Sequence, residues 1–600
     1  MQALSANPVF SALTRGEKLF IESWFIATHP RSLDSFRVRC HNGRTILQEL
    51  KREMGFPFAN AEDLAHIAAE AQEVCSADPV LRQLLAPSWT PLETHLAALA
   101  KANKDESEKA RIQLRNILTD TLEQVSANYL QRTSAALRAA IAANDDKLII
   151  QLTNCLTTDL AARGWALSSL HAFGATKFLA DNPSGTPFTH TFAGFAARIS
   201  QPAEAFEVIL ACSGSAVLHQ LGNFSDFRFS AVAPTVPEKE EDPKRRLEKF
   251  LRTNRYRTFA TTTVQAVDYN SAIHEADEKM AKCLDRLRFN FYKWPVKISP
   301  EALVIRVSDR RHRLVNRVAP IPNPEHHVPL EEFLAMDARL NTLFASQQLA
   351  NESRRRIEAA ARHYRLGLDS QAYRDMVLNW WMGLEILTNA GDGKGIGEKV
   401  IRGALPVIVH RYFKVQLRNV AKLIHTALGN SWPGEAQTLL TVSADTVLTW
   451  QQALTVLQDT TAKNASNTLL ADRPALQIRW MRFAELSNDA AKLLSYLDEH
   501  EQRVRWHLWR LYRIRCCLVH GTPVEMPLQL PAANLEYYLR ECIYVVLGAF
   551  LRATQIPTLE TLFDRASAAA SRRKATLADK SAKADAITAA LNTDFVFRVA

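Results

Sequence analysis

The sequence predicts a mainly α-helical protein with one small α+β domain in its middle and a helical bundle toward its C-terminus. Apolar residues recur at spacings of three and four along most of the chain, which is typical of one buried face of a helix. Alternating and β-branched stretches are confined to residues 171–329. The chain has 600 residues, more than one compact core holds, so we expect about two to four domains.

The composition is that of a folded globular protein. Hydrophobic residues make up 47% and charged residues 23% of the chain, which excludes a wholly disordered protein. The longest apolar run near the C-terminal end, Ile543–Leu551, is shorter than the about 20 residues that cross a bilayer. The first residues lack a charged segment followed by an apolar one, so no secretory signal is expected. We therefore expect a soluble, cytoplasmic protein.

The spacing of the cysteines and the net charge limit the kinds of site and partner that we expect for this chain. The 8 cysteines are scattered along the chain without a C-x-x-C pair. Reduced thiols are therefore favoured over a disulfide framework or a zinc ribbon, and neither a metal nor a cofactor is expected. The formal net charge of +10 permits a nucleic-acid partner but does not establish one.

The first two regions differ in their apolar patterns. Residues 1–170 are predicted to be helical, because apolar stripes run from Leu114 to Tyr129 and from Leu148 to Leu156. Residues 171–329 are predicted to form an α+β domain with a sensory or regulatory role. Its expected elements are strands at 227–233 and 258–269, a helix at 273–287, and a hairpin of 303–307 with 314–318.

Two segments of the α+β domain invite functional interpretations. The acidic connector 237–243 is followed by a run of basic residues up to Arg257, and a solvated surface is favoured over a binding face. The pair His326–His327 lies in the proline-rich loop 320–329, with no recognised ligand spacing around it. Surface histidines are therefore favoured over a metal site.

Helices are predicted to dominate from residue 330 onward. Residues 330–369 are expected to be connecting helices, and 370–558 a helical bundle. The basic, alanine-rich residues 559–600 are expected to be a frayed helix or a mobile tail. The glycine-rich stretch Gly391–Gly397 fits neither the phosphate-loop nor the dinucleotide motif, so we expect a flexible loop between helices.

One stretch near the C-terminus combines positive charge with aromatic residues. Between Arg503 and Pro523, arginines alternate with aromatic residues and no acidic residue interrupts them. No helix breaker precedes Gly521, and Gly521 followed by Pro523 predicts a helix end. His520 is then placed at the carboxyl end of this helix, where the helix dipole favours the protonated imidazole.

Arg515 and His520 are the candidate reactive pair of this stretch. Five residues correspond to about 140° around an ideal helix, so the two side chains would not lie side by side. For both to reach one phosphate, the helix has to loosen at His520, or two copies of the chain have to face each other. An arginine and a histidine five residues apart are common by chance. The pair becomes a candidate site because the arginine-aromatic helix precedes it and the Gly-x-Pro stop follows it.

A second helix of interest is predicted upstream, from Tyr373 to Leu387. Glu385 borders its apolar stripe, one turn after Trp381. A carboxylate in this position either reaches water or pairs with an arginine, and the sequence leaves both alternatives open.

Together, these two helices resemble a known family. The segments Trp381-Met-Gly-Leu-Glu385 and Tyr512-Arg-Ile-Arg-Cys-Cys-Leu-Val-His-Gly521 are similar to the HEPN superfamily (higher eukaryotes and prokaryotes nucleotide-binding), specifically its ApeA-like branch. The resemblance covers about residues 370–555. The family usually has a polar residue, often Asn, directly after the arginine, whereas this chain has Cys516.

The resemblance implies a dimerising helical bundle with metal-independent endoribonuclease activity. In such enzymes the ribose 2′-hydroxyl attacks the adjacent phosphorus, leaving a 2′,3′-cyclic phosphate and a 5′-hydroxyl. His520 would be the general acid/base, Arg515 would bind the phosphate, and Glu385 would orient one of these two. The residues expected to contact RNA, by stacking on a base or gripping a phosphate, are Tyr512, Arg513 and Arg510.

The resemblance also implies a biological role. We expect a protein of bacterial antiviral defence by growth arrest (abortive infection), which cuts tRNA or mRNA and acts as a homodimer. The N-terminal two-thirds of the chain would sense a phage-derived trigger or restrain the nuclease. A non-catalytic RNA- or protein-binding scaffold is the main alternative, and a DNA-binding regulator has only the net charge in its favour.

Overall fold

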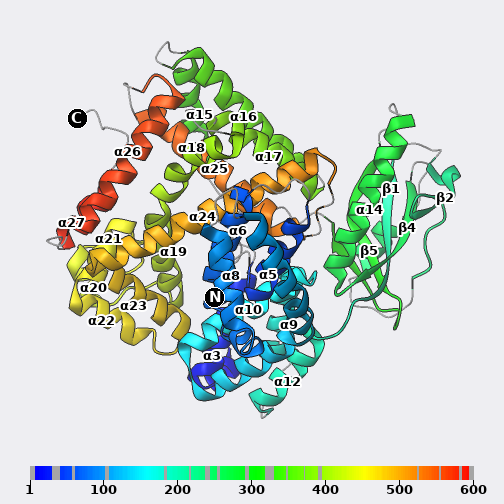
Figure 1. The fold of residues 1–600 in the computed structure, drawn as a ribbon, viewed down its shortest axis with the longest axis horizontal. Coiled ribbons are helices and arrows are strands. Elements are labelled where there is room, and N and C mark those ends of the chain that lie inside the picture. Colours follow the sequence, from blue (N-terminus) through cyan, green and yellow to red (C-terminus); the bar gives the residue numbers. More distant parts are fainter. Residues whose placement is uncertain are drawn as a thin grey trace.

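A computed structural model shows a mainly helical chain with one antiparallel sheet in its middle (Figure 1). In Figure 1 the sheet and the helix α14 stand to one side of a larger helical body. The structure describes residues 7–29, 41–56, 61–101, 107–180, 186–214, 218–236, 244–252, 257–290, 296–317, 330–345, 349–370, 372–388, 395–522, 524, 526–552, 556–579 and 584–593.

The N-terminal region is helical, as its apolar stripes predict. Leu114, Leu118 and Tyr129 are fully buried on one face of the longest helix of the region. The helices are α2 (Pro8–Ser11), α3 (Arg15–Thr28), α5 (Gly43–Gly55), α6 (Ala61–Ser76), α7 (Pro79–Leu84), α8 (Trp89–Lys101), α9 (Ser107–Ala143), α10 (Asp146–Ala162), α11 (Leu167–Ala175), the π-helix η1 (Thr176–Ala180) and α12 (Phe188–Ile199).

This helical region extends beyond the predicted boundary at residue 170. Phe188 and Phe192 of α12 pack edge-on against Phe20 of α3, with ring centroids 6.2 and 5.4 Å apart. The aromatic contacts join α12 to the N-terminal helices. The expected boundary is therefore wrong, and the first strand of the α+β domain begins only at Glu204.

The α+β domain is an antiparallel sheet with the strand order β2-β3-β4-β1-β5-β6. Helix α14 covers one face of the sheet and α13 packs on the other. The predicted helix and hairpin are present as α14 and as β5 with β6. The elements are β1 (Glu204–Ser213), the short 3-10 helix η2 (Leu218–Leu221), β2 (Asn223–Phe224), β3 (Phe227–Ser230), α13 (Lys244–Leu251), β4 (Arg257–Ala266), α14 (Tyr269–Asn290), β5 (Lys297–Arg306) and β6 (His312–Asn316).

The central strand β1 had no counterpart in the sequence-based expectations. Its residues Val208 to Cys212 are all buried, so the strand shows no alternation of apolar and polar side chains. A continuous apolar run of this length is equally compatible with a buried helix. Only its pairing with β4 and β5 on either side identifies it as the centre of the sheet.

The connector 237–243 and the pair His326–His327 lie outside the described residues. Of the basic residues that follow the connector, Arg246 pairs with Glu301 of β5 at 2.5 Å. Arg257 lies over the ring of Phe250, 5.5 Å from its centroid. Both side chains therefore contact residues of their own domain.

The C-terminal region contains two packed groups of helices. The first group is the bundle formed by α15 (Leu330–Ala345), α16 (Asn351–Asp369), α17 (Tyr373–Thr388), α18 (Ile396–His410), α24 (Ala490–Val519), α25 (Gln529–Arg552) and α26 (Leu559–Ala578). The second has a hydrophobic core of its own and interrupts the predicted bundle of residues 370–558. It contains α19 (Tyr412–Ala427), α20 (Gly434–Leu440), α21 (Trp450–Gln458), α22 (Thr460–Leu469), α23 (Pro474–Asn488), the first half of α24 and α27 (Ala584–Asn592).

The expectation of a frayed or mobile tail after residue 558 is wrong for its described part. Leu559, Leu562 and Phe563 of α26 are buried in the main hydrophobic core. Arg573, which is 5% exposed, donates a hydrogen bond to the backbone oxygen of His410 at 3.0 Å. The alanine-rich composition suggested a solvated helix, but its apolar residues at spacings of three and four pack on the bundle.

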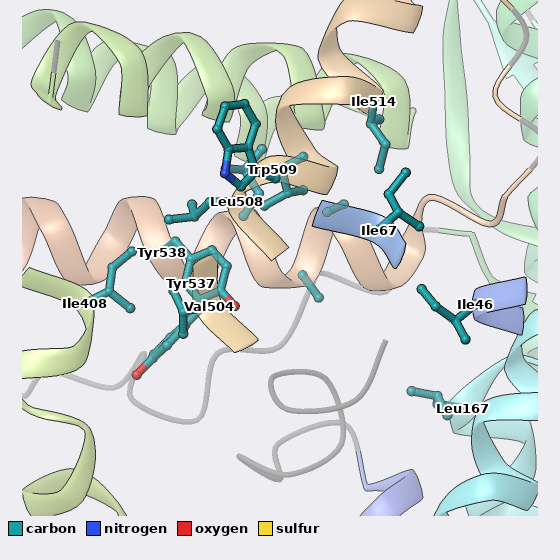
Figure 2. Packing of buried hydrophobic residues seen from close by; sticks show 14 of the residues in the cluster. Ile46, Ile67, Leu167, Ile408, Val504, Leu508, Trp509, Ile514, Tyr537 and Tyr538 are labelled. Atoms are coloured by element: carbon teal, nitrogen blue, oxygen red, sulfur yellow. The ribbon is translucent and has the colours of Figure 1, made fainter. Parts of the chain in front are cut away.

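Helix α24 runs across the centre of the helical body and contacts both the N-terminal helices and the bundle (Figure 1). Figure 2 shows Ile46 and Ile67 of the N-terminal region in the same buried cluster as Trp509 and Ile514 of α24. The two regions therefore share one hydrophobic core. Among the described residues, no helix is both long enough and apolar enough to span a membrane.

Two histidines on α24 are buried in this core and predict a loss of stability in mild acid. His500 and His507 are 5% and 3% exposed, and the ring of His507 hydrogen-bonds the Tyr538 hydroxyl at 2.7 Å. Burial lowers the pKa of His500 to about 3 and that of His507 well below its ordinary value. The unfolded chain, whose histidines titrate near pH 6.5, therefore takes up protons that the folded chain does not.

We expect the free energy of unfolding to fall as the pH drops below about 6.5, by about 1.4 kcal/mol per pH unit for each buried histidine. Urea unfolding at several pH values between 7.5 and 5 measures this slope. His507→Gln is expected to reduce this slope by the contribution of one buried histidine. His190→Gln, at an exposed position, should leave the slope unchanged. Identical slopes for wild type and His507→Gln would contradict the prediction.

Candidate functional site

The end of α24 has the geometry that the Gly-x-Pro stop predicts. The helix ends at Val519, and His520 is the C-cap with φ −90° and ψ 6°, its amide bonded to the Cys516 carbonyl at 3.0 Å. Gly521 has φ +71°, a left-handed conformation that favours glycine. The Thr522 amide donates to the Cys517 carbonyl at 2.9 Å, which closes the helix as a Schellman motif does.

His520 is exposed at this helix end. It follows the last helical residue, Val519, and its amide keeps the regular bond to the Cys516 carbonyl, so the structure leaves open which of the two arrangements would bring His520 and Arg515 to one phosphate. The preceding Val519 is 53% exposed, and the surface around the imidazole is therefore open.

Arg515 lies beside Glu385 of α17. Its Nη2 atom is 3.9 Å from Glu385 Oε2, and the two side chains are 19% and 15% exposed. Trp381 donates from Nε1 to the same carboxylate oxygen at 2.9 Å. Of the two alternatives that the sequence left open for Glu385, the structure shows the pairing with an arginine, and Trp381 holds the carboxylate in place.

The guanidinium of Arg515 retains hydrogen-bonding capacity. Its buried Nε atom has no acceptor among the described residues, and the long contact to Glu385 leaves the pair only loosely joined. The Arg515 side chain as a whole is 19% exposed, and a guanidinium that is only loosely paired is suited to binding a phosphate. Among the described contacts, none joins Arg515 to His520, which lies about 7.5 Å further along the helix axis.

Tyr512 packs between the two motif helices. Its ring centroid is 5.8 Å from that of Trp381 and 6.0 Å from that of Trp509. A side chain at Gly397 would bring its Cβ within 2.9 Å of the Tyr512 ring, so α18 approaches this ring closely only because residue 397 is a glycine. Burial and the neighbouring Cys516 thiol raise the pKa of Tyr512 to about 12. Its hydroxyl therefore stays protonated and able to donate near neutral pH.

Arg510 and Arg513 are not on an RNA-facing surface, contrary to the sequence-based expectation. They are 2% and 7% exposed, and both bind the carboxylate of Glu49 on α5, at 2.9 and 2.7 Å. Arg510 also contacts Glu70 of α6 at 2.5 Å. We call Glu49, Glu70, Arg510 and Arg513 the ionic cluster; in this conformation it has no access to RNA.

The positive charges around Glu49 determine its protonation state. Burial by itself raises the pKa of Glu49, but the charges of Arg510, His41 and Arg513 outweigh burial and hold the pKa well below its usual range. The imidazole Nε2 of His41 is 2.6 Å from a Glu49 oxygen. Glu49 therefore stays ionised inside the protein, where its arginine partners compensate for the loss of hydration.

The remaining arginines of the helix are at the surface. Arg503 pairs with Glu499 at 3.4 Å and Arg505 with Glu501 at 3.6 Å, both one helical turn apart. The arginine-aromatic stretch therefore has two buried arginines, Arg510 and Arg513, and three half-buried ones, Arg503, Arg505 and Arg515. The alternative of a solvated basic face does not describe the buried pair.

Reasoning from the sequence missed the acidic partners of this helix. Glu49 and Glu70 occur in ordinary amphipathic helices, more than 400 positions before Arg510 in the chain, and no local pattern marks them. Trp381 was noted only as a neighbour of Glu385, although its indole nitrogen hydrogen-bonds that carboxylate. In the part of the chain that the structure describes, no group of three or more His, Cys, Asp or Glu residues could hold a metal ion.

Comparison with protein-family models, curated proteins and solved structures gives no match for this chain. The resemblance to the HEPN superfamily is therefore carried by the motif residues of α17 and α24 alone.

Proposed function

We propose that the protein is a metal-independent endoribonuclease of the HEPN type. The observation that carries this proposal is that an exposed imidazole, His520, and the guanidinium of Arg515 both lie at the end of one helix, without a direct contact between them. Glu385 and Trp381 support the guanidinium from a second helix. This set provides a proton shuttle and a cation, which are the two requirements of a reaction whose nucleophile belongs to the RNA.

The proposed reaction is an internal transesterification. The ribose 2′-oxygen forms a bond to the adjacent phosphorus while the bond from phosphorus to the 5′-oxygen breaks. One imidazole takes the proton from the 2′-hydroxyl, and an acid returns a proton to the departing 5′-oxygen. Arg515 stabilises the negative charge that builds up on the non-bridging oxygens. The products are a 2′,3′-cyclic phosphate and a 5′-hydroxyl.

A homodimer fits this chemistry better than a single chain. One chain offers a single His520, whereas the reaction uses both a base and an acid. Two copies that face each other through the bundle supply two imidazoles and two guanidinium groups around one phosphate. We propose this arrangement for the active form, with tRNA or mRNA as substrate and growth arrest during phage infection as the biological outcome.

The experiment that tests the function uses end-labelled RNA and purified full-length protein in EDTA. Cleavage is expected, with cyclic-phosphate and 5′-hydroxyl ends on the products. A matched RNA with a single 2′-deoxyribose at the mapped cleavage position should remain intact there, because it lacks the nucleophile. His520→Ala protein, purified in parallel, controls for contaminating ribonuclease. Cutting at the deoxy position, or products with other ends, would remove the proposal.

A non-catalytic RNA-binding scaffold is the second candidate, and Cys516 in place of the family's usual polar residue favours it. Its test uses the half-buried Arg503 and Arg505, since Arg510 is buried. Loss of RNA binding in the double Glu variant, together with full RNA binding and no cleavage in both wild type and His520→Ala, would support the scaffold.

A further inference from the structure

A large cavity lies between the N-terminal helical region and the C-terminal helices, away from the His520 end of α24. Its volume is about 660 Å³, which is within the range of small-molecule sites. Its walls come from α3, α6 and α10 on one side and from α19, α23 and α24 on the other. Two regions that are far apart in the chain therefore line one cavity.

The cavity carries more available positive charge than negative charge. The cationic side chains that line it are Lys147, Arg479, Arg482 and Arg503. Among the described residues, no carboxylate lies within ion-pair distance of Lys147 or Arg482; Arg503 is 3.8 Å from Glu73, another wall residue.

The other acids of the wall are already occupied. Glu70 binds Arg510 at 2.5 Å. Asp78 accepts a hydrogen bond from the Tyr129 hydroxyl at 2.5 Å and further bonds from the amides of Gly43 and Val80. Arg510 neutralises Glu70, so the four cations of the wall face only the charges of Glu73 and Asp78, and the net charge favours an anion.

Aromatic side chains form the wall opposite α10. Tyr412, Phe483, Tyr496 and Trp506 all line the cavity. The rings of Tyr412 and Tyr496 are stacked, with centroids 5.8 Å apart and an interplanar angle of 22°. The guanidinium of Arg482 lies 5.3 Å from the centroid of Tyr496. Tyr412 also stacks on His500, with centroids 3.3 Å apart, so its two faces are covered. A planar ring in the cavity therefore meets the edges of these aromatic side chains, beside the cation of Arg482.

The cavity wall is continuous with the ionic cluster. Glu70 lines the cavity and binds Arg510, while His41 lines the cavity and contacts Glu49. Glu49 in turn binds Arg510 and Arg513, which lie less than two turns before Arg515 on the same helix. An occupant that attracts or displaces His41 or Glu70 therefore acts on the helix that carries the candidate site.

We propose that this cavity binds a nucleoside polyphosphate, with the phosphates at Lys147 and Arg482 and the base against the aromatic wall. Binding changes the packing of α24 through His41 and Glu70 and so regulates the candidate site. The binding site itself is independent of the proposed ribonuclease function, whereas its effect on RNA cleavage rests on that function.

The test is isothermal titration calorimetry of the full-length protein with ATP, tripolyphosphate and adenosine as separate probes. We expect ATP to bind with a Kd below about 1 mM, and tripolyphosphate and adenosine to bind at least about tenfold more weakly. The double variant Lys147→Glu/Arg482→Glu should weaken ATP binding by at least about tenfold, because both positions are exposed and now repel phosphate. Arg138→Glu, an exposed charge reversal on α9, is the matched control and should bind ATP normally.

Three results would overturn the site: no ATP binding, equal ATP binding by the double variant, or tripolyphosphate or adenosine binding as tightly as ATP. Amide hydrogen exchange of residues 510–519, with and without ATP, tests the link to α24 without using activity. Unchanged exchange would overturn the link while leaving the site standing. Absence of RNA cleavage in every condition would count against the ribonuclease proposal alone, because calorimetry and exchange do not depend on it.

Discussion

His520→Ala is expected to lower the rate of RNA cleavage by about 10²–10⁴-fold, which is the usual contribution of a positioned general acid or base. The side chain is exposed at the helix end, and the cap is made by backbone groups that alanine retains. The free energy of unfolding should therefore change by no more than about 0.5 kcal/mol. The measurement is single-turnover cleavage of end-labelled RNA, with urea unfolding of the same preparation.

The matched control for this substitution is Val519→Ala, at the neighbouring exposed position. It alters the same helix end without removing a titratable group, so cleavage should continue at close to the wild-type rate. Loss of cleavage in both variants would assign the effect to the helix end rather than to the imidazole. Full activity in His520→Ala would show that this histidine takes no part in the reaction.

Glu49→Ala is expected to lower the free energy of unfolding by about 3–5 kcal/mol, because it leaves buried arginines without their shared partner. Arg513 loses the carboxylate that it contacts at 2.7 Å, and Arg510 loses one of its two carboxylate partners in the ionic cluster. The loss of stability arises in the core that the N-terminal region shares with the bundle. It should therefore appear as a lower urea midpoint for the whole helical body and not as the loosening of one exposed helix.

A surface carboxylate supplies the control for Glu49. Glu108 is 67% exposed and pairs with Arg111 one turn away at 3.3 Å, and Glu108→Ala should cost less than about 1 kcal/mol. The combined variant Glu49→Leu/Glu70→Leu/Arg510→Met/Arg513→Met separates charge from packing, since apolar groups of similar volume can replace a whole buried ionic cluster at little cost. A loss for Glu49→Ala as small as that for Glu108→Ala would show that the cluster contributes no stability.

Local regularities were sufficient to predict many of the elements. The stripe from Leu114 to Tyr129 predicted a helix because the 3.6-residue period brings those side chains to one face, and α9 buries them. The predicted hairpin is β5 and β6. The helix end at His520 and Gly521 followed from the one backbone conformation that glycine adopts at low cost.

Burial of charged and alanine-rich helices could not be predicted in the same way. Arg510 and Arg513 had the composition of an RNA-binding surface, yet they are covered by Glu49 and Glu70 of another region. The helix α26 had the composition of a solvated tail, yet it packs on the bundle. In both cases the partner surface comes from a distant part of the chain, and no local pattern encodes which surface that is.

The amino-acid sequence by itself determined many of the helices, the hairpin of β5 and β6, the end of α24, and which side chains carry candidate chemistry, because these depend on neighbours within a few residues. Tertiary structure alone decided which of those side chains are accessible. It left Arg515 and His520 near the surface, placed Arg510 and Arg513 against buried carboxylates, and opened a cationic cavity between two regions. The physical reason is that the solvation and pairing of a charge depend on everything packed around it, and for α24 those groups come from helices hundreds of residues away.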